Sequence, residues 1–245
     1  MKISNLIKFI FPKRCVVCDS ILPYGNSIDC EFICNDCKDK IEFIHEPTCI
    51  KCGAMINDSD EAYCERCKAK LWNNYISGFG LCRYNDFVKE SLHKVKYQGR
   101  AEFIEFYGKL IARMYFNKFK EINADYLIPV PIHKKRFKSR NFNQASILAE
   151  CISKELLNLG LDIKVNNNIA FRVKNTKVLN KLGNVERGSE LNDAFYINSV
   201  SGVDTVIIVD DIYTTGSTID KLAEMLKNSG ISNIYYAAIC VVDNL

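Results

Sequence analysis

Four C-x-x-C pairs in the first 70 residues constrain this chain more than any other feature of its sequence. Zinc ribbons use such pairs because a gap of two residues lets both thiolates of one knuckle reach the same tetrahedral ion. Fifteen residues separate the first pair from the second, and eleven separate the third from the fourth, so each interval can form a hairpin. We therefore predict two structural zinc ions, one held by Cys15, Cys18, Cys34 and Cys37 and the other by Cys49, Cys52, Cys64 and Cys67.

Spacing alone leaves the pairing of these knuckles open. An interleaved arrangement is an alternative, and Cys30 lies close enough to Cys34 in the sequence to compete as a ligand. Redox pairs or disulfides are the other interpretation, which the lack of an adjoining βαβ pattern disfavours. A module this small needs zinc binding as part of its folding free energy. Cys82, Cys151 and Cys240 show no partner pattern, and we expect them in the core.

Length and composition predict a second, larger unit. With 245 residues, 48% of them hydrophobic, the chain has enough apolar material for one good core and a smaller module. We expect a double zinc ribbon over residues 1–75 and an α/β domain over residues 76–245. The 33 basic and 29 acidic residues give a net charge of only +4, which excludes a histone-like protein and means that any nucleic-acid surface is local.

The opening stretch, MKISNLIKFIFPK, is apolar and basic, but it is too short to span a bilayer and Pro12 ends it. We expect an amphipathic lead-in packed on the ribbons, without stable membrane insertion or a cleaved signal peptide; membrane contact is the alternative. Cysteines in metal-site spacing indicate thiolates in a reducing compartment. We therefore predict a cytoplasmic protein.

Beyond the ribbons the pattern alternates between helix and strand. Apolar residues recur at helical spacing in three segments, residues 103–114, 145–159 and 219–226. Three short apolar runs predict buried strands, residues 126–130, 205–209 and 234–242. Gly160 and Gly230 are suited to end the second and third helices. Strand, helix and strand in this order imply parallel crossovers, so we predict an α/β fold with ligands at the carboxyl ends of its strands.

The sharpest motif is VIIVDDIYTTGST, residues 206–218, in which a buried strand leads into two carboxylates and a loop that opens a helix. Asp210 and Asp211 are expected at the strand end, as acceptors for vicinal ribose hydroxyls. A strand-to-helix turn with Asp and Thr as caps is the alternative. Backbone N–H groups and hydroxyls at the positive end of the helix suit a phosphate, and they belong to Thr214, Thr215, Gly216, Ser217 and Thr218.

This motif resembles the phosphoribosyl pyrophosphate motif of type I phosphoribosyltransferases, and other segments are similar to the ComF family. Residues 128–131 resemble the family's P-V-P strand end, residues 140–145 its R-G-F-N-Q-A segment, and residues 92–100 its L-K-Y-x-G-R segment. The C-x-x-C pairs also match. Asn141 stands where the family has glycine. Leu179 and Glu190 replace the usual glutamine and asparagine of the loop that covers the ligand in transferases.

The resemblance implies a phosphoribosyltransferase-like parallel sheet flanked by helices, with a small N-terminal double zinc-ribbon domain. It also implies that Asp210 and Asp211 are the catalytic pair, acting at the ribose. The pyrophosphate would face the segment after Pro131, where the matching cations are Lys135, Arg136 and Arg140. Magnesium would be held mainly by the ligand's own oxygen atoms.

The segment HKKRFKSRNF, residues 133–142, places Phe137 and Phe142 among six potentially cationic side chains. Such a pattern suits the phosphates and unpaired bases of single-stranded DNA, and a solvated loop is the alternative.

These observations leave two candidate functions. The first, implied by the ComF resemblance, is a factor for natural transformation that receives single-stranded DNA, with a competence helicase as candidate partner, and binds phosphoribosyl pyrophosphate or a nucleotide. The second is an active phosphoribosyltransferase with an unknown acceptor.

Overall fold

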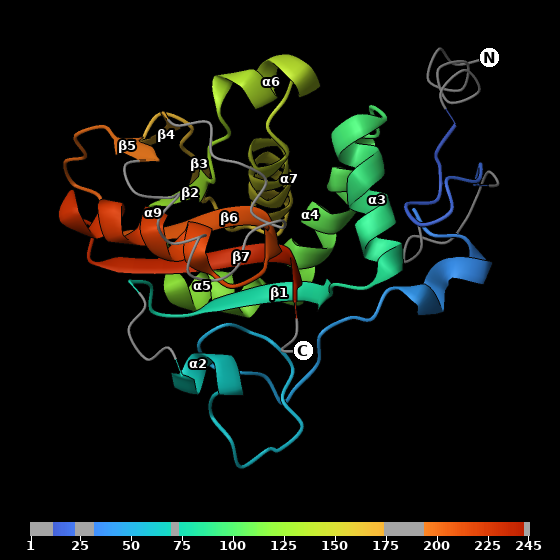
Figure 1. Ribbon diagram of the computed structural model, residues 1–245, viewed down its shortest axis with the longest axis horizontal. Coiled ribbons are helices and arrows are strands. Elements are labelled where there is room, and N and C mark those ends of the chain that lie inside the picture. Colours follow the sequence, from blue (N-terminus) through green and yellow to red (C-terminus); the bar gives the residue numbers. More distant parts are fainter. Residues whose placement is uncertain (1–11, 23–31, 70–73, 174–193, 243–245) are drawn as a thin grey trace.

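The computed structural model describes residues 12–22, 32–69, 74–173 and 194–242, and at its centre is a five-stranded sheet (Figure 1). The strands follow the spatial order β1–β7–β6–β2–β3, and every neighbouring pair runs parallel. Their bounds are β1 Gly78–Arg83, β2 Tyr126–Pro129, β3 Lys164–Val165, β6 Thr205–Tyr213 and β7 Asn233–Val241. The predicted parallel sheet is confirmed.

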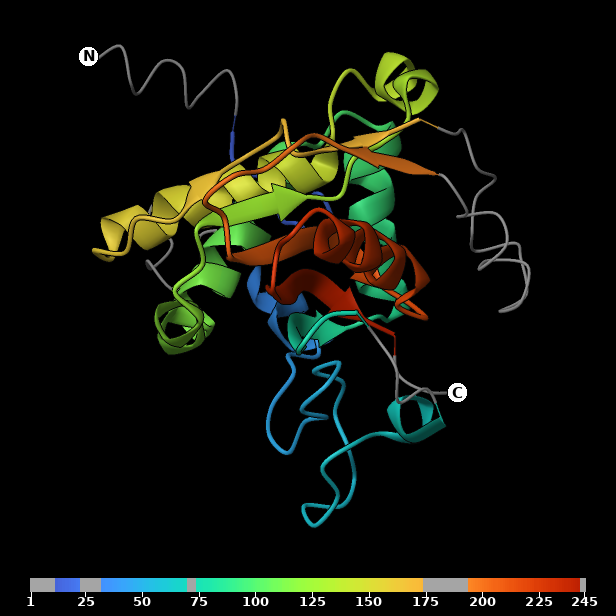
Figure 2. The same ribbon diagram turned by 90° about the vertical axis from the view of Figure 1, so that its left-hand side faces the viewer.

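Both faces of this sheet are covered, as the apolar run of β6 predicts (Figure 2). Ile207 and Val209 pack with one set of helices, whereas Val206 and Ile208 pack toward α9 and an antiparallel hairpin. The first set contains α3 Asp86–Tyr97, α4 Glu102–Met114, α5 Phe116–Ile122 and α7 Gln144–Asn158. The second contains α9 Ser217–Asn228 and the hairpin strands β4 Ala170–Arg172 and β5 Phe195–Ile197.

The helix ends follow the glycine signals of the sequence. Gly160 after α7 and Gly230 after α9 have φ of +90° and +102°, a conformation that favours glycine. The buried Cys82 and Cys240 lie opposite each other in β1 and β7, as expected of core residues, while Cys151 is half-buried. No helix in the described ranges has the length and hydrophobicity to span a bilayer.

Two segments differ from the prediction. Strand β6 does not end at Val209 but continues to Tyr213, because β7 keeps pairing with it, so the acidic pair lies inside the strand. Residues 134–140 form the helix α6, Lys134–Arg140, instead of a loop. The His133 ring accepts a hydrogen bond from the N–H of Lys135 at its start, and Asn141 in a left-handed conformation ends it.

The two ribbons pack against opposite faces of the sheet. The first ribbon contains the short helix η2, Asn35–Lys40, and its side chains join the core around α3 and α4. Phe32 of this ribbon lies against Phe106 of α4, with ring centroids 6.1 Å apart. The second ribbon contains α2, Glu65–Ala69, and its cysteines join the core of the α9 face. Figure 1 shows the first ribbon beside α3 and the second below β1.

Candidate functional site

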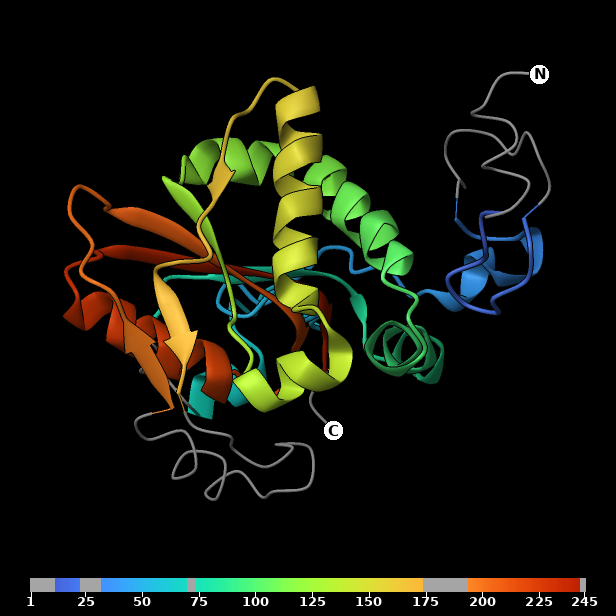
Figure 3. The same cartoon turned by 90° about the horizontal axis from the view of Figure 1, so that it is seen from above.

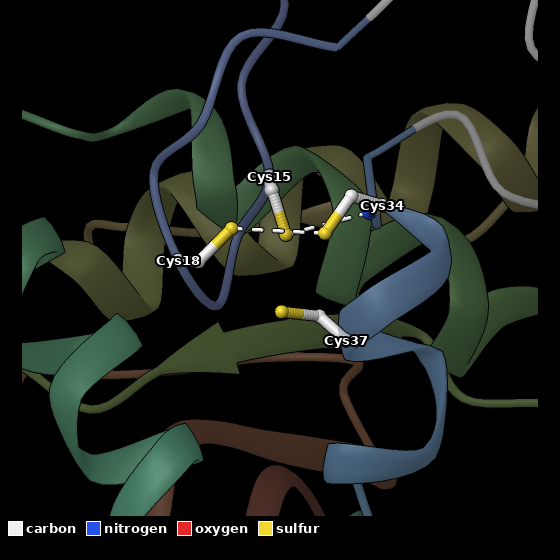
Figure 4. A group of neighbouring side chains, drawn as sticks. All are labelled: Cys15, Cys18, Cys34 and Cys37. Carbon is white, nitrogen blue, oxygen red and sulfur yellow. Dashed lines mark hydrogen bonds between the residues drawn. The ribbon is translucent and has the colours of Figure 1, made fainter.

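Two groups of four cysteines form metal-binding sites. In each group the four sulfur atoms lie within 4.8 Å of one another, and Figure 4 shows how those of the first group point toward one another from two separate segments. The groups are Cys15, Cys18, Cys34 and Cys37, and Cys49, Cys52, Cys64 and Cys67. Each group joins two consecutive C-x-x-C pairs, in agreement with the sequential arrangement, while Cys30 lies outside the described residues. Four thiolates fill the tetrahedral shell of zinc, so both sites fit a structural ion and leave no position for a substrate.

The acidic pair of the β6 motif lies where β6 extends past its neighbour. Strand β2 ends at Pro129, whereas β6 continues to Tyr213. Lys96, in the last turn of α3, forms an ion pair with Asp211. Asp210 accepts a hydrogen bond of 2.9 Å from the backbone N–H of Asp211. Sequence reasoning assigns no role to Lys96, although it lies in the L-K-Y-x-G-R segment.

The two carboxyl groups have opposite pKa shifts because only one has a close cationic partner. Burial acts to raise the pKa of Asp211, but the ammonium of Lys96 outweighs it and holds this pKa below its usual value. Burial, and then the charge of Asp211, raises the pKa of Asp210 well above its usual value. The pair therefore offers an ionised acceptor beside a carboxyl group that resists ionisation, and both can bond a ribose diol.

The hydroxyl loop, residues 214–218, leads from the end of β6 into the first turn of α9, which begins at Ser217. Thr215 Oγ1 and Ser217 Oγ lie 2.9 Å apart at the start of the helix, beside its free N–H groups. Gly216 has a φ of +77°, and a β-carbon there would lie 2.3 Å from the hydroxyl oxygen of Tyr213. Internal packing therefore requires this glycine, in addition to any approach by a phosphate.

The second ribbon contacts this loop through Arg66 of α2, a residue that nothing in the cysteine pattern marks. One guanidinium nitrogen donates to the carbonyl oxygen of Thr214 (2.5 Å) and to that of Val242 (3.0 Å). The other donates to the sulfur of Cys52 (3.7 Å). The guanidinium also lies 5.2 Å from the ring centroid of Tyr213. Arg66 thus links a four-cysteine site directly to the loop.

Of the cations of α6, Arg140 lies near the acidic pair and Lys135 does not. Against the effect of burial, Lys96, then a hydrogen bond with Asp210 and last Arg140 lower the pKa of Asp211. The guanidinium of Arg140 is held 3.2 Å from the Tyr97 hydroxyl. Lys135 is exposed and forms no ion pair within the described part of the chain. The structure therefore brings Arg140 to the site and leaves Lys135 on the outer surface of α6.

Arg172 of β4 is a further cation that sequence reasoning misses. Burial, and then the positive charge of Arg136, lower the pKa of Arg172 to about 10, while Asp210 acts in the opposite direction. Burial, and then Arg140, lower the pKa of Arg136. Like charges are thus held together at a partly buried place, where an anionic ligand would be stabilised. The sequence offers no signal for Arg172, because it lies outside the motifs.

The described residues offer magnesium no protein cage at this site. No third carboxylate or histidine joins Asp210 and Asp211 among the residues that the structure describes. Asp211 is also engaged by Lys96. Mg²⁺ requires octahedral oxygen coordination, so it would take most of its ligands from a bound phosphate compound and from water.

The chain is similar to several known proteins. The family model of the double zinc ribbon domain matches residues 6–68. The chain is 30% identical over 207 residues to competence protein ComFC of Bacillus subtilis, covering 82% of this chain and 80% of that protein. It is 27% identical to competence protein ComFC of Streptococcus pneumoniae (91% and 92% covered) and 24% identical to DNA utilization protein YhgH of Shigella flexneri (94% and 97% covered). A solved hypoxanthine-guanine phosphoribosyltransferase of Schistosoma mansoni, in complex with IMP, is similar over 57% of this chain and 56% of that chain, with 19% identity and a TM-score of 0.33.

Two four-cysteine sites that precede a parallel α/β domain define a double zinc ribbon protein with an appended α/β unit. Identity of 30% across four fifths of both chains shows the family as well. The chain belongs to the competence protein ComFC family.

Proposed function

We propose that this protein is a cytoplasmic factor for DNA uptake that binds single-stranded DNA and, with magnesium, phosphoribosyl pyrophosphate or a related ribose 5-phosphate nucleotide. The observation that carries the ligand is a group of three cations beside the acidic pair, Lys96, Arg140 and Arg172, with Arg136 next to the two arginines. Relatives named for competence and for DNA utilization support the DNA role.

Each part of such a ligand has a matching group. The 5-phosphate suits the hydroxyls and N–H groups of residues 214–218, and the ribose diol suits Asp210 and Asp211. The pyrophosphate suits the guanidinium groups of Arg136, Arg140 and Arg172, because Arg136 lies near the positive charges of both others. A ligand that combines a diol with several phosphates can therefore contact both the acidic pair and the guanidinium groups.

Calorimetry with phosphoribosyl pyrophosphate and with inorganic pyrophosphate tests this assignment. The double variant Asp210→Asn with Asp211→Asn is expected to lose affinity for the phosphoribosyl compound about tenfold or more, because the ribose acceptors are weakened. It should retain affinity for pyrophosphate, since the cations remain. Equal affinity of wild type and variant for phosphoribosyl pyrophosphate would contradict a ribose role for the pair.

The DNA surface is proposed to include α6 and the ribbons. Lys135 and Arg136 supply positive charge on α6, beside Phe137, so the double reversal Lys135→Glu with Arg136→Glu should weaken binding and reduce its salt dependence. Lys120→Glu with Lys154→Glu is the matched control, because it makes the same change in net charge at exposed positions on α5 and α7. If both double variants retain DNA equally in gel-shift titrations, α6 is not the binding surface.

An active phosphoribosyltransferase is the second candidate. The observation that favours it is the grouping of guanidinium groups near the acidic pair, since positive charge would stabilise pyrophosphate as it leaves the ribose. Release of pyrophosphate from phosphoribosyl pyrophosphate, screened with free bases and with DNA as acceptors, separates a transferase from a protein that only binds the ligand.

A further inference from the structure

A cavity of about 930 Å³ adjoins the proposed phosphoribosyl site and shares Arg172 with it. Its walls come from the end of β2, helix α6, the start of α7 and the hairpin β4–β5, and Figure 3 shows α6 and the hairpin on either side of β2. Neither the acidic pair nor residues 214–218 line it. The cavity is therefore a separate place, large enough for a nucleotide.

Three exposed aromatic rings line this cavity. Phe171 and Tyr196 lie directly opposite each other in the hairpin and are 39% and 55% exposed, and Phe137 of α6 is 50% exposed. Their strand neighbours Ala170 and Arg172 are buried, so the hairpin alternates and presents its aromatic pair on the open face. A single exposed ring is ordinary, but three from separate segments around one cavity indicate a stacking surface.

Side-chain amides add hydrogen-bonding groups to the same walls. Asn167 accepts a hydrogen bond of 2.8 Å from the hydroxyl of Ser146, which fixes the orientation of its amide. Asn198 donates to the carbonyl oxygen of Asn168 (2.8 Å), and Asn141 is exposed at the end of α6. An amide carries a donor and an acceptor side by side, as the edge of a nucleobase does.

The positive charge of α6 indicates what else a ligand that stacks on these rings carries. Lys134 lines the cavity, and Lys135 and Lys138 are exposed on the same helix, so a ligand with negative charge outside the aromatic walls is favoured. A base in a duplex is stacked and paired, so it enters a cavity only at the cost of unstacking and unpairing. An unpaired base can be inserted while its phosphates stay at the helix.

We propose that this cavity takes one unpaired base of single-stranded DNA, stacked against Phe171, Tyr196 and Phe137, with the flanking phosphates on the lysines of α6. The inference rests on the proposed DNA function, and it adds the place where a base is held. It also puts bound DNA next to the phosphoribosyl site, because Arg172 belongs to both.

Fluorescence anisotropy with two oligomers of equal length, oligothymidylate and an abasic phosphodiester chain, tests the proposal. The wild type should bind oligothymidylate at least about fivefold more tightly than the abasic oligomer. Phe171→Leu with Tyr196→Leu keeps apolar side chains but removes two of the three rings. It should reduce this preference to about twofold or less and leave affinity for the abasic oligomer unchanged, which also shows that the variant is folded. Phe87→Leu, at a 44% exposed ring on α3, is the control and should behave like the wild type.

The outcomes distinguish failure of the base cavity from failure of DNA binding itself. If the wild type binds both oligomers equally, and the α6 charge reversal weakens both, DNA binding stands and the base cavity is overturned. If the double leucine variant keeps the full preference for oligothymidylate, bases are held elsewhere and the cavity is again overturned. If the wild type binds neither oligomer, the DNA function itself fails, and the cavity proposal fails with it.

Discussion

Asn141 shows how one residue can depart from a family pattern without changing the backbone. It stands where the ComF pattern has glycine, and it ends α6 with φ of +65° and ψ of 3°. Asparagine tolerates the left-handed conformation better than other residues with a β-carbon. The departure therefore preserves the turn between α6 and α7.

Substitutions at Asn141 test this explanation. Asn141→Gly should leave the free energy of unfolding unchanged within about 1 kcal/mol, because glycine adopts the same φ. Asn141→Val should lower it by about 1–2 kcal/mol, since a β-branched residue is strained there. Urea denaturation measures both values. A valine variant as stable as the glycine variant would mean that the turn does not hold its left-handed conformation in solution.

Asp210 should reduce the stability of the ligand-free protein as pH rises. Its pKa is raised in the folded state, so the folded protein holds a proton that the unfolded chain releases above about pH 4. The contribution of Asp210 to the free energy of unfolding is fully present below this pH and is lost as pH rises toward its folded pKa. Asp210→Asn should therefore become more stable than the wild type as pH increases, while it binds ribose ligands more weakly.

The neighbouring carboxylate provides a control of opposite sign. The pKa of Asp211 is lowered against burial by Lys96, so its stabilisation is present above about pH 4 and is lost as pH falls through the folded pKa. Asp211→Asn should destabilise the protein near neutral pH by leaving Lys96 without its carboxylate. Urea denaturation at pH 4, 6 and 8 compares the variants, and parallel stability curves for both would contradict the assigned pKa shifts.

At the scale of elements, periodicity decides what the sequence can predict. Strands β6 and β7 and helices α4, α7 and α9 follow apolar patterns, and the structure contains them. Strand β1 is missed because Gly78 and Gly80 interrupt its apolar run, although a β-carbon at Gly78 would lie 2.0 Å from the ring of Tyr236. Helix α6 has no buried residue, so no apolar period marks it, and caps at both ends define it.

The residues of the candidate site also fall into those that the sequence predicts and those that it does not. The acidic pair and the hydroxyl loop are contiguous in the sequence, so one motif predicts both. Lys96, Arg66 and Arg172 come from α3, α2 and β4, and they reach the site only through tertiary packing. Residues that meet across a fold leave no spacing signal in a single sequence.

Arg66 links α2 to the hydroxyl loop. Replacing Arg66 tests whether the second ribbon supports this loop. Arg66→Gln keeps a polar side chain but removes the shared donor to the carbonyl groups of Thr214 and Val242. We expect affinity for phosphoribosyl pyrophosphate to fall about tenfold, because an unsupported loop must be ordered on binding. Zinc content should stay at two per chain. An unchanged affinity in calorimetry would show that the loop holds its conformation without the ribbon.

At the scale of the whole molecule, the two ribbons contact the elements of the site from opposite sides. Lys94 of α3 donates to the carbonyl oxygen of Val17 in the first ribbon (3.0 Å), and Arg100 pairs with Asp19 (3.0 Å). The same helix supplies Lys96 to the acidic pair. The second ribbon supports the hydroxyl loop. Zinc is therefore expected to affect the ligand site, although neither ion has a position open to a ligand.

Removal of a ligand from the second zinc site tests how far this coupling extends. Cys64→Ser should reduce the zinc content from two ions to one per chain, measured by elemental analysis. A division at residue 75 predicts that the ribbon then unfolds alone and the sheet keeps its stability. The shared core predicts otherwise, because the hydroxyl of Tyr236 in β7 donates to the carbonyl oxygen of Cys52 (2.6 Å) and both residues are buried.

We expect Cys64→Ser to lower the free energy of unfolding of the sheet by about 3 kcal/mol or more, because Tyr236 and its neighbours lose the ribbon that covers them. Cys18→Ser is the matched control, since Cys18 is the exposed ligand of the first site, on the other face. It should also remove one zinc ion but leave the α9 face covered. Hydrogen exchange of β7 and α9 amides separates the two cases: faster exchange in Cys64→Ser alone supports the shared core, and unchanged exchange in both variants supports independent domains.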